Sequence, residues 1–222
     1  MTTGRILLLG LTALFLSSCK GESSEAEMTA PVVHTEIPLA ADKYVADTLN
    51  SVITWKGSKP TGSHRGTINL SSGVIYITKD SLETGRFVIN MKSITVTDPE
   101  SGSDKENLEN HLKGLKEGKE DHFFNTGKYP TGIFEITDIT EEGNTAIING
   151  SLKLKDITKS IKFPADVAVY ADSLLIQSQK FTINRTLWNI NFSSKSIFEN
   201  LGDKYIDDDI ELQISLKALR EK

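Results

Sequence analysis

Several segments of the sequence show a strict alternation of apolar and polar side chains. In residues 210–218, one side of the alternation carries only apolar groups: Ile210, Leu212, Ile214, Leu216 and Ala218. The same period of two recurs in residues 87–91 and 161–169. A period of two over several segments is the pattern of β-strands that bury one face. These segments therefore predict strands with one dry side.

Shorter apolar segments predict further strands. They cover residues 52–57, 66–70, 74–78, 132–137, 145–154, 174–179 and 181–185. Turn-forming sequences lie between them, such as SSG at 71–73, EEGN at 141–144 and YADS at 170–173, a spacing typical of antiparallel meanders. Because antiparallel strands must protect their edges, we expect an all-β fold that closes into a barrel. A sandwich is the alternative that periodicity alone leaves open.

One short helix is predicted near residues 104–117, where leucines recur at the helical spacing. These leucines are Leu108, Leu112 and Leu115. Ser103 or Asp104 would cap the N-terminus of the helix, and Gly118 would end it. The acidic stretch at 98–109 matches a calcium-binding loop in spacing only, because Ser103 stands where the sharp turn requires glycine. We interpret that stretch as a mobile acidic loop.

The N-terminus has the layout of a secretory signal peptide. Arg5 precedes an apolar run at 6–16 that is too short to span a bilayer, and small residues follow. The ending LSSC resembles the lipobox of bacterial lipoproteins. The resemblance implies a signal peptide of residues 1–18 and an acylated Cys19 that serves as the lipid anchor. An ordinary secreted protein with an incidental cysteine is the alternative.

Cys19 is the only cysteine, so no internal disulfide is possible and the fold must rest on its own core. Residues 19–43 are rich in small, acidic and proline residues, which predicts a flexible tether with a reach of about 25–30 Å. Lys20 stands where lipoproteins retained at the inner membrane of Gram-negative cells often carry aspartate. The expected location is therefore the cell envelope, on the outer membrane and facing the periplasm.

Residues 44–220 form one expected domain, large enough for a core. The formal charge of the chain is −5 and becomes −6 once Arg5 leaves with the signal peptide (24 basic against 30 acidic residues). The lysines are scattered among acidic residues, without a basic stripe or basic–aromatic interleaving. This pattern argues against a nucleic-acid partner and leaves the oligomeric state open.

The segment at 109–130 holds two of the four histidines and raises the question of a metal or catalytic site. His111 and His122 stand eleven residues apart with no third histidine nearby, whereas a metal site needs three or four converging ligands. No nucleophile motif accompanies them. We therefore expect no metal, cofactor or catalytic residue here, and interpret the aromatic residues of the segment as bulk at one end of the barrel.

Five segments, in order along the chain, together resemble the YceI-like polyisoprenoid-binding family. They are SVITWKGSKPTGSHRGTINL at 51–70, HLKGLKEGKEDHFFNTGKYPTGIFEIT at 111–137, NGSLKLKDITKSIKFPADV at 149–167, FTINRTLWNINF at 181–192 and IDDDIELQISLKA at 206–218. The resemblance implies an elongated, lipocalin-like antiparallel barrel of about eight strands with a lipid tail along its interior. Residues 114–120 and His122 depart from the family pattern, because they separate its HLK motif from its Phe pair.

Ligand contacts are expected from aromatic and polar residues of these motifs. The candidates are Trp55, His64, Phe123, Phe124, Tyr129, Phe134, Arg185 and Trp188. Aromatic faces offer apolar area with little directional demand, which suits a repetitive isoprenoid chain, although such residues equally serve as ordinary core. Arg185, in a predicted strand, either points inward to a head group or an internal carboxylate, or is a surface charge. His64 is expected on a loop between strands.

The sequence thus predicts a non-enzymatic protein that binds and carries or stores an isoprenoid lipid, quinone-like or polyprenyl, in the cell envelope. The alternative is a structural or interaction lipoprotein whose barrel is packed solid and whose surface binds a protein partner. The size of the inward side chains separates the two. Small or medium residues such as Ala165, Val167, Val169 and Ile214 leave room for a ligand, whereas a predominance of aromatics would fill the interior.

Overall fold

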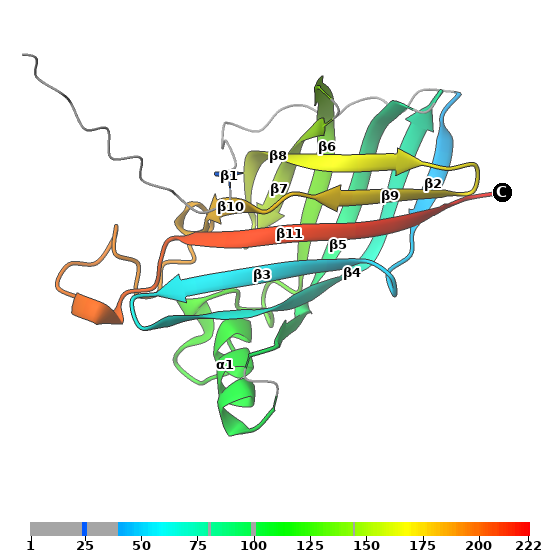
Figure 1. Cartoon of the computed structure of the whole chain (residues 1–222). Coiled ribbons are helices and arrows are strands. Elements are labelled where there is room, and N and C mark those ends of the chain that lie inside the picture. Colours follow the sequence, from blue (N-terminus) through cyan, green and yellow to red (C-terminus); the bar gives the residue numbers. More distant parts are fainter. Residues whose placement is uncertain (1–23, 26–39, 80, 99–100, 144) are drawn as a thin grey trace, which may run out of the picture.

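The structure is a computed structural model of the chain (Figure 1). It describes residues 24–25, 40–79, 81–98, 101–143 and 145–222. The predicted signal peptide, the predicted anchor Cys19 and most of the predicted tether lie outside these residues. Among the described helices, none has both the length and the apolar character that crossing a bilayer requires.

In the described residues, eleven strands form one sheet that curls into an elongated ring (Figure 1). The strands are β1 (Ser24–Glu25), β2 (Asp42–Ala46), β3 (Val52–Lys59), β4 (Gly62–Thr78), β5 (Ser81–Val96), β6 (Thr131–Glu142), β7 (Thr145–Leu154), β8 (Ile157–Val169), β9 (Ser173–Ser178), β10 (Phe181–Asn184) and β11 (Asp209–Arg220). Strands β4 to β9 follow one another as antiparallel neighbours, β11 joins β9 to β3, and β3 returns to β4. The predicted all-β class is confirmed, as a ring of about eight antiparallel strands.

Short strands share positions in the ring. β2 and β3 each pair with both β4 and β11, so together they act as one interrupted strand. β9 and β10 likewise lie along the same edge of β11. β1 adds a short parallel pairing to the outer edge of β10.

Strand β4 is longer than the sequence predicts. The segments predicted at 66–70 and 74–78 belong to one continuous strand, so the interpretation of SSG at 71–73 as a turn is wrong. The register between β4 and β5 shifts there, between Leu70 and Ser72. Small residues thus accommodate a bulge inside a long strand where they resemble a turn in the sequence.

The strand predicted at 181–185 ends one residue early. The side chain of Asn184 accepts a hydrogen bond from the main-chain nitrogen of Thr186 (3.0 Å) and caps the 3-10 helix η2 (Arg185–Trp188). Arg185 therefore lies on a helical turn, which corrects its predicted place in a strand.

The inward faces of the strands carry the apolar positions that the alternation predicts. In β5, Phe87, Ile89 and Met91 are all buried. One end of the ring is packed solid; we call it the closed end, and it includes the buried residues Tyr44, Ile75, Leu174 and Ala218. The closed end therefore provides a conventional hydrophobic core.

Helix α1 (Ser103–Lys113) is shorter than predicted. Gly114, with φ +72°, ends it in the left-handed conformation, and a Cβ at this position would overlap the carbonyl oxygen of Glu120. Leu115, predicted on the apolar face of the helix, follows this end and is 60% exposed. Gly102, not Ser103 or Asp104, occupies the N-cap position.

Arg185 is buried and holds a long connection in place. The residues between η2 and β11 make an excursion from the barrel that contains the 3-10 helix η3 (Gly202–Lys204) (Figure 1). The guanidinium of Arg185 donates to main-chain oxygens at both ends of this excursion: Nη1 to Ile190, Nη2 to Ile206 (3.0 Å) and Nε to Asp207 (3.0 Å). The interpretation of Arg185 as a surface charge is therefore wrong.

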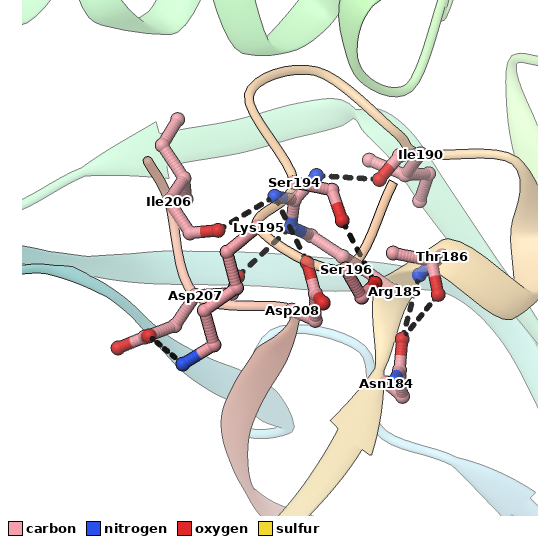
Figure 2. Close-up of polar contacts among 10 residues, drawn as sticks. All are labelled: Asn184, Arg185, Thr186, Ile190, Ser194, Lys195, Ser196, Ile206, Asp207 and Asp208. Atoms are coloured by element: carbon pink, nitrogen blue, oxygen red, sulfur yellow. Dashed lines mark hydrogen bonds and ion pairs between the residues drawn. The ribbon is translucent and has the colours of Figure 1, made fainter. Parts of the chain in front are cut away.

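Asp208 completes this clamp (Figure 2). Its Oδ1 lies 3.7 Å from Nη2 of Arg185, and its main-chain oxygen accepts from the Arg185 nitrogen (2.8 Å). Burial opposes ionisation of Asp208, but hydrogen bonds from Ser194 and Ser196, with the charge of Arg185, hold its pKa below the usual range. The sequence left two inward partners open for Arg185, a ligand head group and an internal carboxylate. The structure shows the internal carboxylate, which is Asp208.

Replacement of Gly66 by alanine is expected to destabilise the ring. A Cβ at Gly66 would overlap the carbonyl oxygen of Thr95 and lie 2.6 Å from the ring of Trp55. We expect Gly66→Ala to lower the free energy of unfolding by about 1–3 kcal/mol, measured by urea denaturation of the mature chain. Gly57→Ala is the matched control, because a Cβ there meets nothing within 4 Å. Equal effects of the two substitutions would contradict the close packing at Gly66.

Loss of the Arg185 clamp is expected to lower the free energy of unfolding more than Gly66→Ala does. Arg185→Met retains much of the side-chain length but leaves three main-chain oxygens without their donor and Asp208 without its cation. We expect a loss of about 3–5 kcal/mol in the free energy of unfolding. Arg65→Met is the control, since the side chain of Arg65 is 67% exposed and its ion pair with Asp98 should contribute almost nothing. A loss for Arg185→Met no larger than the control's would show that the clamp does not stabilise the fold.

Candidate ligand-binding cavity

The ring encloses a cavity with a predominantly apolar wall. The volume of this cavity is about 300 Å³. The strands supply inward side chains along its length, for example Ile89 from β5, Ile148 from β7 and Leu212 from β11. The cavity reaches solvent at the end where the exposed Lys59 joins its wall, and we call this end the mouth. The alternative interpretation of the sequence required an interior that is packed solid. The cavity shows that the interior is not packed in this way.

Seven of the eight residues predicted to contact a ligand lie in the cavity wall. They are Trp55, His64, Phe123, Phe124, Phe134, Arg185 and Trp188. Tyr129 is not among the lining residues. It lies in the connection before β6, where its main-chain nitrogen donates to Asn125 (2.8 Å) and Lys128 Nζ lies 5.1 Å from its ring centroid.

The sequence analysis argued that small or medium inward side chains leave room for a ligand, and this argument holds only in part. Ile214 lines the cavity, but Ala165, Val167 and Val169 do not. Val169 pairs with Leu174 of the closed end, so its medium size serves packing there. Room for a ligand comes instead from the whole inward face of β11 near the mouth, where Ile210 lies beside Leu212 and Ile214.

The sequence interpretation missed a row of aromatic side chains along one wall. Phe163 stacks on Phe181 at 4.5 Å between ring centroids, and Phe134 lies 5.8 Å from Phe163 and 6.4 Å from Phe87. All four line the cavity. The alternation of the strands places Phe87 and Phe163 on inward faces, so the signal was present, but it could not distinguish cavity wall from packed core.

The two tryptophans differ in their polar atoms. Trp188 Nε1 donates to the main-chain oxygen of Leu152 (3.1 Å), which fixes this fully buried side chain in the wall. Trp55 Nε1 is also buried, but no hydrogen-bond acceptor for it is found among the described residues. An unpaired buried donor is costly, and Trp55 is held in the wall by packing and not by a hydrogen bond to any described residue.

One side of the mouth is formed by α1 and by the 3-10 helix η1 (Glu120–His122) with the aromatic residues around it. His111 Nε2 lies 2.9 Å from His122 Nδ1, and the ring of Phe192 stacks on His122 at 4.1 Å. Phe123 packs edge-on against His111 at 5.0 Å. Burial, followed by the nearby charge of His122, lowers the pKa of His111, which favours the neutral ring that a histidine–histidine hydrogen bond requires.

The histidine pair lacks further ligands for a metal. In the part of the chain that the structure describes, no group of three or more His, Cys, Asp or Glu side chains is arranged to hold a metal ion. The hydrogen bond between the two histidines and their ring contacts with Phe123 and Phe192 join the helix to the aromatic residues of the mouth.

Among the described residues, the polar side chains of the cavity wall lie toward the mouth: Ser58, Lys59, His64, His111, Arg185 and Asp207. His64 lies inside β4 opposite Gly57 and not on a loop, so that prediction is wrong. Its Nδ1 lies 3.0 Å from the main-chain oxygen of Asp98. The nitrogens of Arg185 are all engaged by main-chain oxygens, so Arg185 supports the wall and is poorly placed to receive a head group.

Solved structures share this architecture. BcnA of Burkholderia cenocepacia aligns with a TM-score of 0.61 and 16% identity over 78% of this chain and 98% of that chain. A polyisoprenoid binding domain from Saccharophagus degradans, implicated in plant cell wall breakdown, aligns with a TM-score of 0.56 and 14% identity over 80% and 98%. The YCEI protein of Campylobacter jejuni aligns with a TM-score of 0.52 and 16% identity over 96% and 100%. At these identities the likeness concerns the fold.

Sequence comparison gives the family. A UPF0312 protein of Pseudomonas paraeruginosa is 38% identical over 56 residues, and the matched part spans only 29% of that relative's length and 25% of this chain. The model of the YceI-like domain matches residues 44–218, which include β3 to β10 and most of β11. The protein therefore belongs to the YceI-like domain family.

Proposed function

We propose that the protein binds an isoprenoid lipid, quinone-like or polyprenyl, and carries or stores it in the cell envelope without catalysing a reaction on it. The observation that carries this proposal is the apolar cavity with one closed end and polar groups confined to the mouth. A linear hydrocarbon tail with a polar head matches this division.

The tail would gain its binding free energy from removal from water. Each methylene moved into an apolar site contributes about 0.8 kcal/mol, so a long tail has ample driving force even after its loss of conformational freedom. The wall of Ile, Leu and Phe side chains makes no directional demands. A chain of repeated isoprene units therefore fits it without specific polar contacts.

The head group would lie near the mouth. Lys59 and His64 are polar groups of the wall there, and Trp55 Nε1 is a buried donor without an acceptor among the described residues. The polyisoprenoid binding domain of Saccharophagus degradans, whose fold is similar, supports the same ligand class.

The location follows from the proposed anchor. An acylated Cys19 would hold the chain at a membrane, and residues 19–43 would let the barrel reach about 25–30 Å from it. We propose the outer membrane, with the barrel in the periplasm, as this site of attachment. A lipid ligand and a lipid anchor then belong to the same compartment.

Filling the cavity is expected to remove the ligand. The full chain, purified in mild detergent from membranes of its own host, should release an isoprenoid on organic extraction, at close to one per chain by mass spectrometry. Ile214→Trp adds bulk inside the cavity and should lower this ratio several-fold. Ser215→Trp, on the opposite face of the same strand, is the control and should retain the ligand. An empty extract from the unsubstituted, folded protein would refute the proposal.

The anchor is tested separately. We expect the mature chain to begin at Cys19 and to incorporate an alkyne-bearing fatty acid supplied to growing cells. Cys19→Ser should abolish this label, because the acylated thiol is gone, whereas Ser18→Ala keeps a small residue before the cysteine and should retain it. In-gel detection of the label is the measurement. Persistent labelling of Cys19→Ser would rule out this anchor.

A further inference from the structure

Residues 190–207 form an excursion at the mouth that we call the mouth arm. It projects beyond the end of the barrel, past the turn between β3 and β4 (Figure 1). Phe192 and Ile206, near its two ends, line the cavity. The main-chain nitrogen of Asp207 donates to the oxygen of Ser58 (2.9 Å), which joins the arm to the mouth end of β3. The arm is therefore continuous with the opening of the cavity.

The base of the mouth arm is rigidly held. Arg185 bonds to main-chain oxygens of Ile190, Ile206 and Asp207, so a single buried side chain joins the start of the arm to its end (Figure 2). Ser194 forms an isolated bridge with Ile206 across the arm. Both ends of the mouth arm are therefore held at the barrel by hydrogen bonds.

At residues 197 and 198 the mouth arm presents apolar side chains to solvent, and we call this pair the tip. Ile197 and Phe198 are adjacent and are 47% and 48% exposed, and Leu187, on η2 beside the base, is 36% exposed. The main-chain nitrogens of Ile197 and Phe198 bond back to Ser194 (3.4 and 3.0 Å), which turns the chain at this point. The tip is therefore an apolar projection on an ordered base.

The charges around the tip cancel. Between residues 195 and 204, Lys195 and Lys204 are balanced by Glu199 and Asp203. A surface of this kind has no electrostatic preference for an anionic partner. Contact through the tip must therefore be apolar in origin and nearly independent of salt.

We propose that the tip of the mouth arm, Ile197 and Phe198, contacts the lipid bilayer and holds the mouth against it, so that a ligand passes between bilayer and cavity without crossing water. This inference rests on the proposed function, since the reason for the contact is an insoluble isoprenoid that resides in membranes. A bilayer fits better than a protein, because two half-exposed side chains are far smaller than a specific protein interface.

The contact is expected to be weak by itself. Even a myristoyl chain gives only marginal binding to a bilayer. A tether to the same membrane raises the effective concentration of the arm to about the millimolar range, so a weak contact is populated without permanently fixing the barrel. Reversible contact suits a carrier that must also leave the membrane surface.

A fluorescent probe on the arm tests the contact. The full chain carrying Ile197→Cys, labelled with the polarity-sensitive dye NBD and reconstituted into phosphatidylcholine vesicles that contain doxyl-labelled lipid, should show a blue shift and strong quenching. Leu175→Cys is the matched control, because Leu175 is 41% exposed on β9 near the closed end. The unsubstituted protein, treated in the same way, gives the background from Cys19.

Exposed apolar side chains also occur toward the closed end, on Val45, Leu175 and Leu219. None of these three residues lines the cavity described above. Quenching at position 175 as strong as that at 197, or absence of quenching at 197, would overturn the proposal. Quenching at 197 that disappears in high salt would also overturn it, because the charges of the tip cancel.

Transfer kinetics test the role of the contact. The double substitution Ile197→Ser and Phe198→Ser should slow isoprenoid transfer between donor and acceptor vesicles by at least about threefold, because less apolar area reaches the bilayer. The amount of isoprenoid bound per chain should not change. The double substitution Val45→Ser and Leu219→Ser is the control and should leave the transfer rate unaltered.

The outcomes separate this inference from the proposed function. If the double substitution Ile197→Ser and Phe198→Ser changes neither the isoprenoid content nor the transfer rate, the proposed role of the arm is overturned. The proposed carrier function is unaffected by that result. Lack of any isoprenoid in the unsubstituted protein would refute the proposed function, while selective quenching at position 197 would still support membrane contact. Crosslinking of position 197 to a protein in native membranes, without quenching by doxyl lipid, would replace the bilayer by a protein partner and overturn the inference.

Discussion

Closure of the ring by β11 is the constraint on which the other features depend. β11 pairs with β3 and β2 along one edge and with β9 and β10 along the other. Main-chain donors and acceptors of the wall are thereby satisfied within the sheet, so the wall does not need a solid interior to support it. The side chains around the cavity forgo packing contacts as a result, and a bound ligand would restore them. The cavity and the stability of the ring are two aspects of one arrangement.

The strands of the fold were largely predictable, because a period of two is a direct consequence of strand geometry. The inward face of β11 and the buried face of β5 follow the alternation closely. Prediction failed where a run of small polar residues is compatible with more than one local structure. The sequence SSG at 71–73 has the composition of a turn, yet it lies in a bulge, since only pairing with the distant strand β5 decides between the two. The sequence offers two glycines, Gly114 and Gly118, as the end of α1, and the helix ends at the first of them in the left-handed conformation.

The candidate site was predictable in its composition and less so in its geometry. Trp55, Phe123 and Phe124 could be chosen because large apolar side chains in barrel motifs face the interior or its end. The role of Arg185 could not be predicted, because its partners are main-chain oxygens that become close only when the chain doubles back at residues 190–207. The difference between Trp55 and Trp188 also depends on tertiary contacts: one indole nitrogen reaches the oxygen of Leu152, and the other reaches none of the described acceptors.

The closed end gives the cavity a fixed depth. Tyr44, Ile75, Leu174 and Ala218 fill the barrel beyond the cavity, so a lipid tail bound as we propose would stop at a floor and would have to leave through the mouth. A channel closed at one end would fit a lipid tail best when the tail is as long as the channel. A tail shorter than the channel leaves part of the wall uncovered, and a longer one keeps its last isoprene units outside. For the isoprenoid ligand that we propose, the distance from floor to mouth, set by how many residues of β11 separate Ala218 from Ile210, would select among homologous lipids that differ only in their number of repeats.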